Sequence, residues 1–482
     1  MKNLLLVFCL FISFNAFSQV EQATLLGQWS DDSLVGSAAF DNAYNEIWGL
    51  ALDGREYAVI GTTLGTHIID VTDPRNPVEI HVVEGAVTGP AIIHRDYHDD
   101  GCLLYVVADE PTSANASVRS TLQIIDISGL PEEVDVVYDS DELIFRAHNI
   151  FLDEPNDRLY AFIANGGNIG FSAMRIYDIS NPIDPQFVAA YNDLQGLSIS
   201  QVHDGYVLDN MAYLNLGPNG FAIVDFTDPL TPVLMGTLDN YPEQGYNHSG
   251  WLSQDGQYYY MADETHGLRM KVLDVSDPTD IDLVDFFDAG SPAETSIPHN
   301  LLVACDYLYV SHYYDGLQVY DISDPSTPVR IAEFDTSLLP DDDGFVGAWG
   351  VYPFLPSGNI LVSDMQEGLF VFEAIDETNC SQRRQMCSSD VVSTSTIELR
   401  NDMFTLQPNP ARDYIELNAR ENMDVSLEIA LTDITGRQIT SSVGDFSGGK
   451  HTIDLPRNLA PGMYLLSVKG EDFIFTEKII IE

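Results

Sequence analysis

The sequence predicts an all-β protein: a seven-bladed β-propeller closed by an N-terminal strand, followed by a small C-terminal β-sandwich. Three observations predict this fold. One short phrase recurs, with variations, seven times at a regular interval. Each repeat holds four strand-like runs bounded by turn residues. An unmatched strand pattern also lies at the start of the repeat region, where it can complete the last repeat.

The recurring phrase is an apolar strand followed by Asp, a hydrophobic residue, Ser or Thr, Asp and Pro. Clear copies occupy residues 68–74, 223–229, 272–278 and 319–325, weaker copies begin at Asp126 and Asp178, and a seventh copy at 369–373 ends on Glu373. The spacing of about fifty residues is in the range of propeller blades.

Four strand patterns in each repeat describe a propeller blade. In the sixth repeat, three of them lie at 307–310, 316–320 and 328–334, and all are rich in β-branched and aromatic residues. The Pro of the phrase ends the third strand, because it cannot donate to a ladder. The Asp residues before it can accept hydrogen bonds from nearby backbone N–H groups. We therefore expect them to build turns rather than metal loops, since no EF-hand-like run of oxygen ligands is present.

The two ends of the repeat region predict how the ring closes. No fourth strand follows Glu373, whereas residues 23–29 precede the first repeat without a blade of their own. These residues resemble 231–238, the fourth strand of another repeat. We therefore expect residues 23–30 to pair with residues 367–373, which would remove two exposed sheet edges.

The first residues predict export. Lys2 is followed by an apolar run at 4–14, and Ala16 and Ser18 are the small residues that a signal peptidase recognises. Residues 1–18 are therefore predicted to be a signal peptide, cleaved before Gln19. The run is too short for a permanent membrane anchor, and no other stretch is long enough. We expect a soluble mature protein with no direct membrane insertion.

The charge balance excludes two classes of partner. Asp and Glu number 74 against 21 Lys and Arg, which gives a formal net charge of −53. Phosphates of nucleic acid require Lys and Arg, and anionic lipid surfaces attract basic segments. The sequence therefore argues against nucleic acid and anionic membranes as partners and favours a solvated acidic surface, with specific Ca²⁺ binding as the alternative.

The cysteines predict one disulfide. Cys380 and Cys387 lie close together in a polar segment of an exported chain, where a disulfide can form. Cys102 and Cys305 each precede a strand pattern and are expected to be plain buried thiols.

The end of the chain forms a separate region. Residues 376–402 are polar and are predicted to be a linker after the propeller of residues 19–375. Alternating polarity with Gly and Pro punctuation follows over residues 403–482 and predicts a small sandwich of about seven strands.

One set of side chains is a candidate binding site. Histidines stand at matching positions, at the start of the first strand, in four successive repeats, and Trp takes that place in two others: the set is Trp48, His148, His203, His248, His299 and Trp349. In the second repeat, Arg95 and Asp96 are expected there. Because first strands line the channel of a propeller, the four histidines could bind a divalent metal. Alternatively, each histidine could bond an Asp and tie loops together, as in WD-repeat propellers.

Adjacent acids at loop positions, Asp109 with Glu110 and Asp263 with Glu264, are a weaker candidate for catalysis or Ca²⁺ binding, and we expect them to be solvated surface. No HExxH, G-x-S-x-G, phosphate-loop or dinucleotide motif is present, and none of these patterns firmly implies a cofactor. The sequence therefore favours a binding module for an extracellular protein or glycan. A propeller hydrolase or lyase with a His-lined channel and a structural adhesin or surface scaffold remain alternatives.

Two family resemblances agree with this organisation. The Asp-Val-Thr-Asp-Pro and Asp-Ile-Ser-Asp-Pro phrases, with Asn149 and Asn300 beside their histidines, resemble the LVIVD-repeat and choice-of-anchor B proteins of bacteria over residues 23–375. This resemblance implies an extracytoplasmic propeller and no agreed activity.

The second resemblance concerns residues 403–482. The phrases Pro-Asn-Pro (408–410), Asp-Ile-Thr-Gly-Arg (433–437) and Leu-Ala-Pro-Gly-Met-Tyr (459–464) resemble, in order, the type A sorting domain of the type IX secretion system of Bacteroidetes. The resemblance implies passage through the periplasm, recognition by the type IX secretion machinery and a final place outside the cell or on the outer-membrane surface.

Overall fold

The computed structural model describes residues 20–375 apart from 111–117, 168, 292–293 and 341–343, then Cys380, and residues 398–481 apart from 400–403, 413, 420–425, 434–437, 446–449, 456–458, 460–461 and 470–472. The predicted signal peptide lies outside these residues, as does most of the predicted linker. The chain forms two compact units, Met1–Val391 and Val392–Glu482. Apart from one 3₁₀ turn, η1 (Glu154–Asn156), the described residues contain strands and loops without helices.

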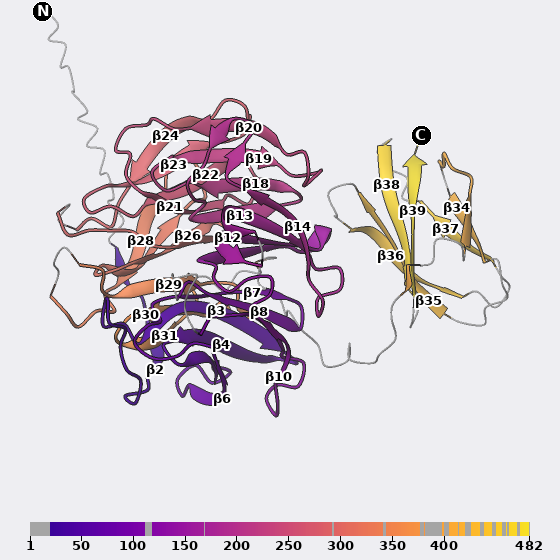
Figure 1. The fold of residues 1–482 in the computed structure, drawn as a ribbon. Helices are drawn as coiled ribbons and strands as arrows, with labels where there is room; N and C mark the ends of the chain where they lie inside the picture. Colours follow the sequence, from indigo (N-terminus) through magenta and orange to yellow (C-terminus); the bar gives the residue numbers. More distant parts are fainter. Residues whose placement is uncertain are drawn as a thin grey trace, which may run out of the picture. The chain divides into compact units, whose positions relative to one another are not determined.

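The first unit contains seven antiparallel sheets, each with four blade strands (Figure 1). Blade 1 consists of β3 (Tyr44–Leu52), β4 (Arg55–Thr62), β5 (Gly65–Asp70) and β6 (Val78–Glu84), and blade 2 of β7 (Arg95–Asp100), β8 (Leu103–Ala108), β9 (Leu122–Asp126) and β10 (Asp135–Ser140). Blade 3 consists of β11 (Asn149–Asp153), β12 (Arg158–Gly166), β13 (Gly170–Asp178) and β14 (Gln186–Tyr191), and blade 4 of β17 (Asp204–Leu208), β18 (Met211–Asn215), β19 (Phe221–Asp225) and β20 (Val233–Leu238). Blade 5 consists of β21 (Asn247–Leu252), β22 (Tyr258–Asp263), β23 (Met270–Asp274) and β24 (Asp282–Phe287). Blade 6 consists of β25 (Leu301–Ala304), β26 (Tyr307–His312), β27 (Gly316–Asp321) and β28 (Val329–Phe334). Blade 7 consists of β29 (Ala348–Tyr352), β30 (Ile360–Asp364) and β31 (Gly368–Phe372), together with β2 (Leu25–Trp29). A short hairpin, β15 (Asp193–Leu194) and β16 (Leu197–Ser198), follows blade 3.

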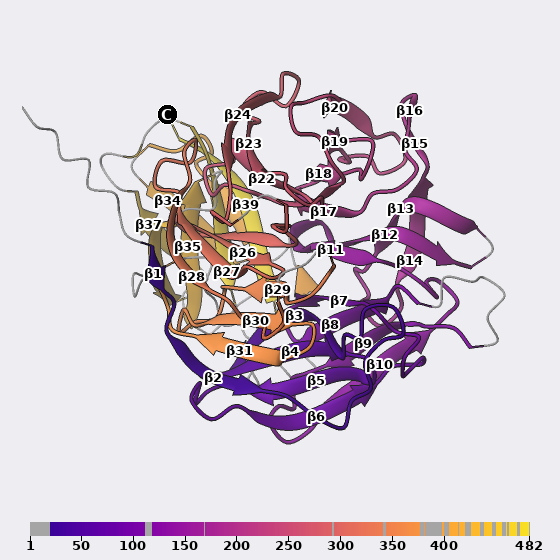
Figure 2. The same cartoon turned by 90° about the vertical axis from the view of Figure 1, so that its left-hand side faces the viewer.

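The sheets form a closed ring. The first strand of each blade contacts the first strand of the next, and β29 of blade 7 contacts β3 of blade 1. Figure 2 shows β3, β7, β11, β17 and β29 toward the middle of the ring, with β6, β10, β20 and β24 toward the outside. The interior between blades is filled by apolar clusters that draw on neighbouring sheets. The fold is therefore the predicted seven-bladed propeller.

The N-terminal strand closes the ring as predicted. Strand β2 pairs antiparallel with β31, with Leu25 opposite Phe372 and Trp29 opposite Leu369, and both views show the two strands side by side (Figures 1 and 2). The ring contains one further pairing that the sequence did not indicate. The two residues of β1 (Glu21–Gln22) run parallel to β28 at the outer edge of blade 6.

A glycine explains why residues 23–29 resemble the fourth strand of blade 4. Each of these strands carries a glycine, Gly27 or Gly236, next to a β-bulge. A Cβ at Gly27 would lie 2.2 Å from the backbone oxygen of Pro74, and one at Gly236 would lie 2.3 Å from that of Pro278. Both prolines belong to the Asp-Pro turn of the next blade. Only glycine therefore fits at these two positions, where the fourth strand approaches the turn of the next blade closely.

The recurring Asp residues build turns, as expected. The first Asp of the phrase accepts a hydrogen bond from the backbone N–H two residues later in six blades, for example Thr72 N to Asp70 Oδ1 at 2.9 Å and Ser323 N to Asp321 Oδ1 at 2.8 Å. The second Asp does the same in four of them. These bonds satisfy the backbone where Pro interrupts the ladder.

The predicted pairing of Cys380 with Cys387 is wrong. Cys380 forms a disulfide with Cys305, across 75 residues, with the two Cα atoms 5.8 Å apart. Cys387 itself lies outside the described residues. Cys102 is also disulfide-bonded, so neither Cys102 nor Cys305 is a plain buried thiol. Sequence proximity favoured the short loop, but a folded ring brings the β25–β26 turn to the chain that leaves blade 7. In the chain-entropy model, a disulfide that closes a loop of this length stabilises the fold by about 4 kcal/mol.

The second unit is a small two-sheet β structure, which agrees with the predicted sandwich. One sheet has the order β32 (Glu398–Leu399), β39 (Phe473–Ile481), β38 (Gly462–Lys469), β35 (Ser426–Asp433) and β36 (Gln438–Asp445). The other has the order β33 (Phe404–Gln407), β34 (Tyr414–Ala419) and β37 (Lys450–Asp454). A core of alternating apolar residues, including Ile415, Ile429 and Leu466, lies between them.

Candidate functional site

Six aromatic side chains form a closed circle at one end of the propeller channel. We call this circle the histidine ring, and its members are His94, His148, His203, His248, His299 and Trp349. Neighbouring histidine rings have centroids 4.1 to 4.7 Å apart, and Trp349 closes the circle at 4.4 Å from His299 and 5.4 Å from His94. They line a pocket of about 240 Å³. The structure thus brings the four predicted histidines and Trp349 together.

Two predicted members of this set lie elsewhere. Blade 2 contributes His94, which the sequence analysis missed, because the buried Arg95 turns away to bond the carbonyl oxygens of Thr62 and Val87. Trp48 lies further along β3 and lines a different pocket. Strand β3 carries a register shift between Tyr44 and Ile47, and Trp48 lies beyond it, at the strand position of Trp251 and Tyr352 and not at that of the ring.

Hydrogen bonds fix the orientation of three ring histidines. His148 Nδ1 lies 2.9 Å from Asp109 Oδ2, and this is the His–Asp contact that a structural role predicts. His203 and His299 instead use Nδ1 to bond backbone oxygens of the following blades, those of His248 at 3.3 Å and Trp349 at 2.5 Å. Nδ1 must donate to a carbonyl, so Nε2 of both residues carries the lone pair.

Acidic groups surround the histidine ring. Asp109, Glu110 and Glu264, which we expected on the solvated surface, all line this pocket. Burial raises the pKa of Glu110 and of Glu264 to about 7. The Tyr313 hydroxyl donates to Glu264 Oε1 at 2.6 Å and holds that carboxyl beside the ring. The expectation failed because these loops fold into the channel instead of pointing to water.

Charge in the ring is distributed unevenly. Burial and the neighbouring imidazoles lower the pKa of His94, His203 and His248 well below the ordinary value, and burial lowers the pKa of His299 to about 3. Burial acts in the same direction on His148, but the Asp109 carboxylate outweighs it and raises the pKa of His148. Four of the five imidazoles are therefore neutral at neutral pH.

Buried carboxyl groups occupy the middle of the channel. This acid layer consists of Glu46, Asp96 and Asp204, which line a narrow space of about 50 Å³, with Asp204 directly after His203 and Asp96 two residues after His94. Glu46 accepts a hydrogen bond from Asn300 Nδ2 at 2.8 Å, and Asp96 accepts one from the Ile150 N–H at 2.7 Å. Burial raises the pKa of Glu46 to about 8 and that of Asp204 to about 6.

The acid layer predicts a pH-dependent stability. The pKa of Glu46 rises from 4.5 to about 8 on folding, so the folded state keeps a proton that the unfolded state releases between these values. The contribution of this proton to the free energy of unfolding is complete below pH 4.5. It is lost as pH rises toward 8, by roughly 1.4 kcal/mol for each pH unit. Glu46→Gln cannot titrate. Its unfolding free energy, measured by urea denaturation between about pH 5 and pH 7.5, should therefore fall less steeply than that of the wild type. Glu132→Gln, at an exposed position, should keep the wild-type slope, and equal slopes for all three proteins would contradict the assignment.

A second circle of aromatic side chains lies beyond the acid layer. We call it the aromatic mouth, and its members are Trp48, His98, Phe151, Tyr206, Trp251, Phe354 and Tyr352. Neighbouring rings have centroids 4.8 to 5.9 Å apart, and Tyr352 closes the circle on Trp48 at 5.0 Å. The residues line a largely apolar pocket of about 300 Å³.

A spacing in the sequence could have revealed the aromatic mouth. Phe151, Tyr206 and Trp251 each follow a ring histidine by three residues, and Tyr352 follows Trp349 in the same way. Three positions along a strand span about 10 Å, so the two circles are stacked along the channel. Alternation alone would turn residues three apart to opposite faces. In β21 and β29 a register shift beside His248 and Trp349 adds the extra residue that turns both toward the channel, whereas His148 and His203 precede the first residue of β11 and β17.

Comparison with known families agrees with the two units. LVIVD repeats match residues 159–193, 201–240, 249–288 and 299–336, which lie in blades 3 to 6. Blades 3 to 6 of the β-propeller are therefore LVIVD repeats. Residues 405–482 match the secretion system C-terminal sorting domain, the type IX secretion signal of Bacteroidetes. The chain is thus a propeller with LVIVD repeats and a type IX sorting domain, handled by the type IX secretion machinery and exported to the cell surface or the extracellular space.

Comparison with solved structures gives matches at low sequence identity. The periplasmic gluconolactonase PpgL of Pseudomonas aeruginosa aligns with a TM-score of 0.50 at 10% identity, covering 86% of this chain and 99% of that one. The WD40 repeats of RRP9 align at 0.49 and 9% identity, covering 73% and 99%. A putative 6-phosphogluconolactonase from Bacteroides uniformis aligns at 0.44 and 11% identity, covering 90% and 100%. No curated protein matches the sequence. In the described residues, no helix has the length and apolar character needed to cross a bilayer.

Proposed function

We propose that this exported propeller is a binding module that holds the end of a neutral glycan in its aromatic mouth. The observation that carries the proposal is the closed circle of seven aromatic rings around one concave pocket. Its volume of about 300 Å³ lies at the lower end of the range for small-ligand sites. A pocket of that size admits the end of a chain and leaves the rest of the polymer outside.

The exposure of the rings suits stacking. Trp48, Phe151, Tyr206, Trp251 and Phe354 are half-buried, so each keeps part of its surface open while its neighbours hold it rigid. The C–H face of a pyranose ring can pack on such surfaces, and aromatic side chains supply large contact area at low entropic cost.

Charge selects among glycans. Asp153 and Glu154 lie in the wall of the pocket, and the net charge of the chain is −53. Sulfated or uronic-acid polymers would meet repulsion here, whereas neutral hydroxyls can donate to carboxylates. The proposal therefore specifies an uncharged glycan.

The test uses residues 19–482 on an array of neutral and acidic glycans, followed by titration of the best ligand. Binding should be confined to neutral glycans, and Trp251→Ala or Phe354→Ala should weaken it by about tenfold or more. Phe187→Ala is the matched control, because Phe187 lies on the outer strand β14 and is 40% exposed. It should bind like the wild type.

Other outcomes point to the remaining functions and against the proposal. Retention of a protein from a surface extract without glycan binding would favour an extracellular protein partner or an adhesin. Release of soluble sugar from a bound polymer would favour a hydrolase or lyase. Binding that survives both aromatic substitutions would place the site outside the aromatic mouth.

A further inference from the structure

We propose that the histidine ring, at the other end of the channel, binds one first-row divalent transition-metal ion, with His248, His299 and Glu264 as its first ligands. This inference concerns different residues from the glycan proposal and stands independently of it.

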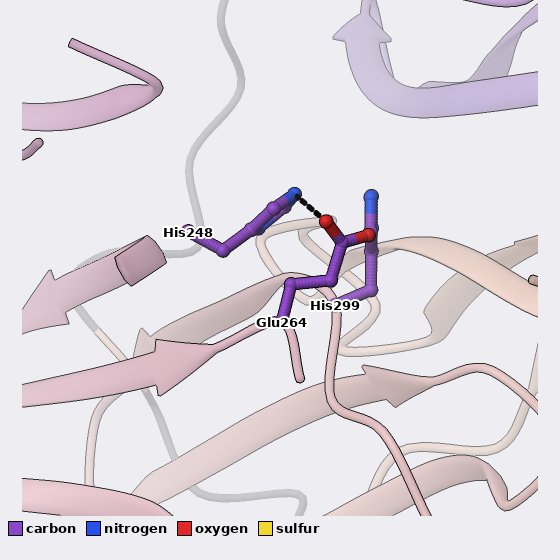
Figure 3. A group of neighbouring side chains, drawn as sticks. All are labelled: His248, Glu264 and His299. Atoms are coloured by element: carbon purple, nitrogen blue, oxygen red, sulfur yellow. Dashed lines mark ion pairs between the residues drawn. The ribbon is translucent and has the colours of Figure 1, made fainter. Parts of the chain in front are cut away.

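The first observation is the geometry of three donor groups. Ligand atoms of His248, Glu264 and His299 all lie within 4.8 Å of one another. His248 Nε2 is 3.9 Å from Glu264 Oε2, which is too long for a hydrogen bond. Two metal–ligand bonds of about 2.1 Å span up to about 4.2 Å, so an ion fits between these atoms. Figure 3 shows the His248 imidazole facing the Glu264 carboxylate, with His299 beside it.

The second observation is the orientation of the imidazoles. A metal-binding histidine characteristically donates its other ring N–H to a carbonyl or a carboxylate, which fixes the tautomer. His299 does this through Nδ1 to the Trp349 oxygen, and His203 does it to the His248 oxygen. His148 contacts Asp109 in the same manner. The backbone of the following blades thus prepares Nε2 of His203 and His299 as a ligand, whereas the partner of His148 is a side chain.

The third observation is a group of unsatisfied nitrogen atoms. His94 and His248 are 4% and 3% exposed. In the described part of the chain, the Nδ1 of His248 has no hydrogen-bond partner, and neither nitrogen of His94 makes a well-formed hydrogen bond. Leaving a buried polar group unpaired costs about 1–3 kcal/mol. An ion held in the ring would offer a partner to a nitrogen of His94, whereas His248, which faces Glu264 through Nε2, would keep its Nδ1 unpaired.

The donor set determines the class of metal. Imidazole nitrogens with one carboxylate suit Zn²⁺, Cu²⁺, Ni²⁺ or Fe²⁺, whereas Ca²⁺ and Mg²⁺ prefer sites made wholly of oxygen. Asp109 and Glu110 in the same pocket supply further negative charge.

The experiment uses residues 19–482 with excess Mg²⁺, which occupies weak carboxylate sites on the acidic surface. Zn²⁺ or Cu²⁺ is added, loosely held ions are removed by gel filtration, and the retained metal is measured by elemental analysis. One equivalent should remain. The electron paramagnetic resonance spectrum of the Cu²⁺ form should show coupling to at least two imidazole nitrogens, and Zn²⁺ should raise the melting temperature of the wild type.

Variants locate the site. Glu264→Gln and His299→Gln should weaken Zn²⁺ binding by at least about 100-fold, since each removes a direct ligand. His81→Gln is the matched control, because His81 lies on the outer strand β6 and bonds the Pro131 oxygen. It should retain one equivalent. Glu264→Gln is isosteric and leaves an oxygen for the Tyr313 hydroxyl, so it should fold.

Three results would overturn the proposal. The first is no metal retained by the wild type in the presence of Mg²⁺. The second is a Cu²⁺ spectrum with oxygen ligands alone, which would indicate surface carboxylates. The third is equal Zn²⁺ affinity in the wild type, Glu264→Gln and His299→Gln. Any of these would leave the ring as a purely structural stack that ties blades together. Because the wild-type spectrum needs no variant, misfolding of a substituted chain does not prevent a decision.

Discussion

Deleting residues 19–31 is expected to destabilise the propeller by at least about 3 kcal/mol and to cause aggregation. The deletion removes β2, and the N–H and C=O groups of β31 that now pair with it become an open edge. It also removes Trp29, which packs on Tyr44 at 6.1 Å and on His67 at 5.4 Å. The loss is thus both a sheet edge and the apolar contact between blades 7 and 1.

The measurement is urea denaturation followed by tryptophan fluorescence, together with light scattering at a fixed protein concentration. A shorter deletion of residues 19–22 is the control, because it removes β1 and leaves β2 in place. Since Glu21 and Gln22 are exposed and pair over two residues, this variant should unfold close to the wild type. If the longer deletion matches the shorter one in both assays, β2 does not close the ring in solution.

The closure could be predicted from the sequence because both of its halves leave a trace there. Glu373 lacks a following strand, and residues 23–29 carry the Gly and alternating apolar pattern of a fourth strand. The repeat makes this prediction possible, because each blade shows which strands the next blade must contain. The four histidines and Trp349 were predicted for the same reason, as each stands at one repeating position.

The features that could not be predicted from the sequence are those in which a blade departs from the repeat. His94 was missed because Arg95 occupies the aligned position and turns away, so its neighbour completes the ring. Trp48 was misplaced by a bulge. The partner of Cys380 lies 75 residues back, and nothing local distinguishes Cys305 from Cys387. Such contacts are determined by packing between blades. The spacing of residues along one strand contains no information about that packing.

The second large effect concerns a buried ion pair that composition could have revealed. Lys271 is the single lysine between residues 19 and 375, in a region dominated by acids. It lies on β23 with its side chain fully buried, and its Nζ is 2.9 Å from Oδ2 of the equally buried Asp263. Asp263 also accepts hydrogen bonds from the Gly245 N–H at 2.7 Å and the Tyr241 hydroxyl at 3.0 Å. Burial lowers the pKa of Lys271, so its charge is retained at a cost that Asp263 offsets.

Lys271→Met should therefore destabilise the propeller by about 3–5 kcal/mol, because it leaves a buried carboxylate with neutral donors alone. The double variant Lys271→Met/Asp263→Asn should recover part of this loss, since the amide oxygen still accepts the Gly245 N–H and no charge remains. Urea denaturation of both variants and the wild type gives the coupling free energy. Arg119→Met, which removes one partner of an exposed pair 3.7 Å apart, should cost less than about 1 kcal/mol. If Lys271→Met lowers the free energy of unfolding by as little as Arg119→Met does, water reaches Asp263 in solution. Blade 5 would then be accessible to solvent at a position that is buried in the structure.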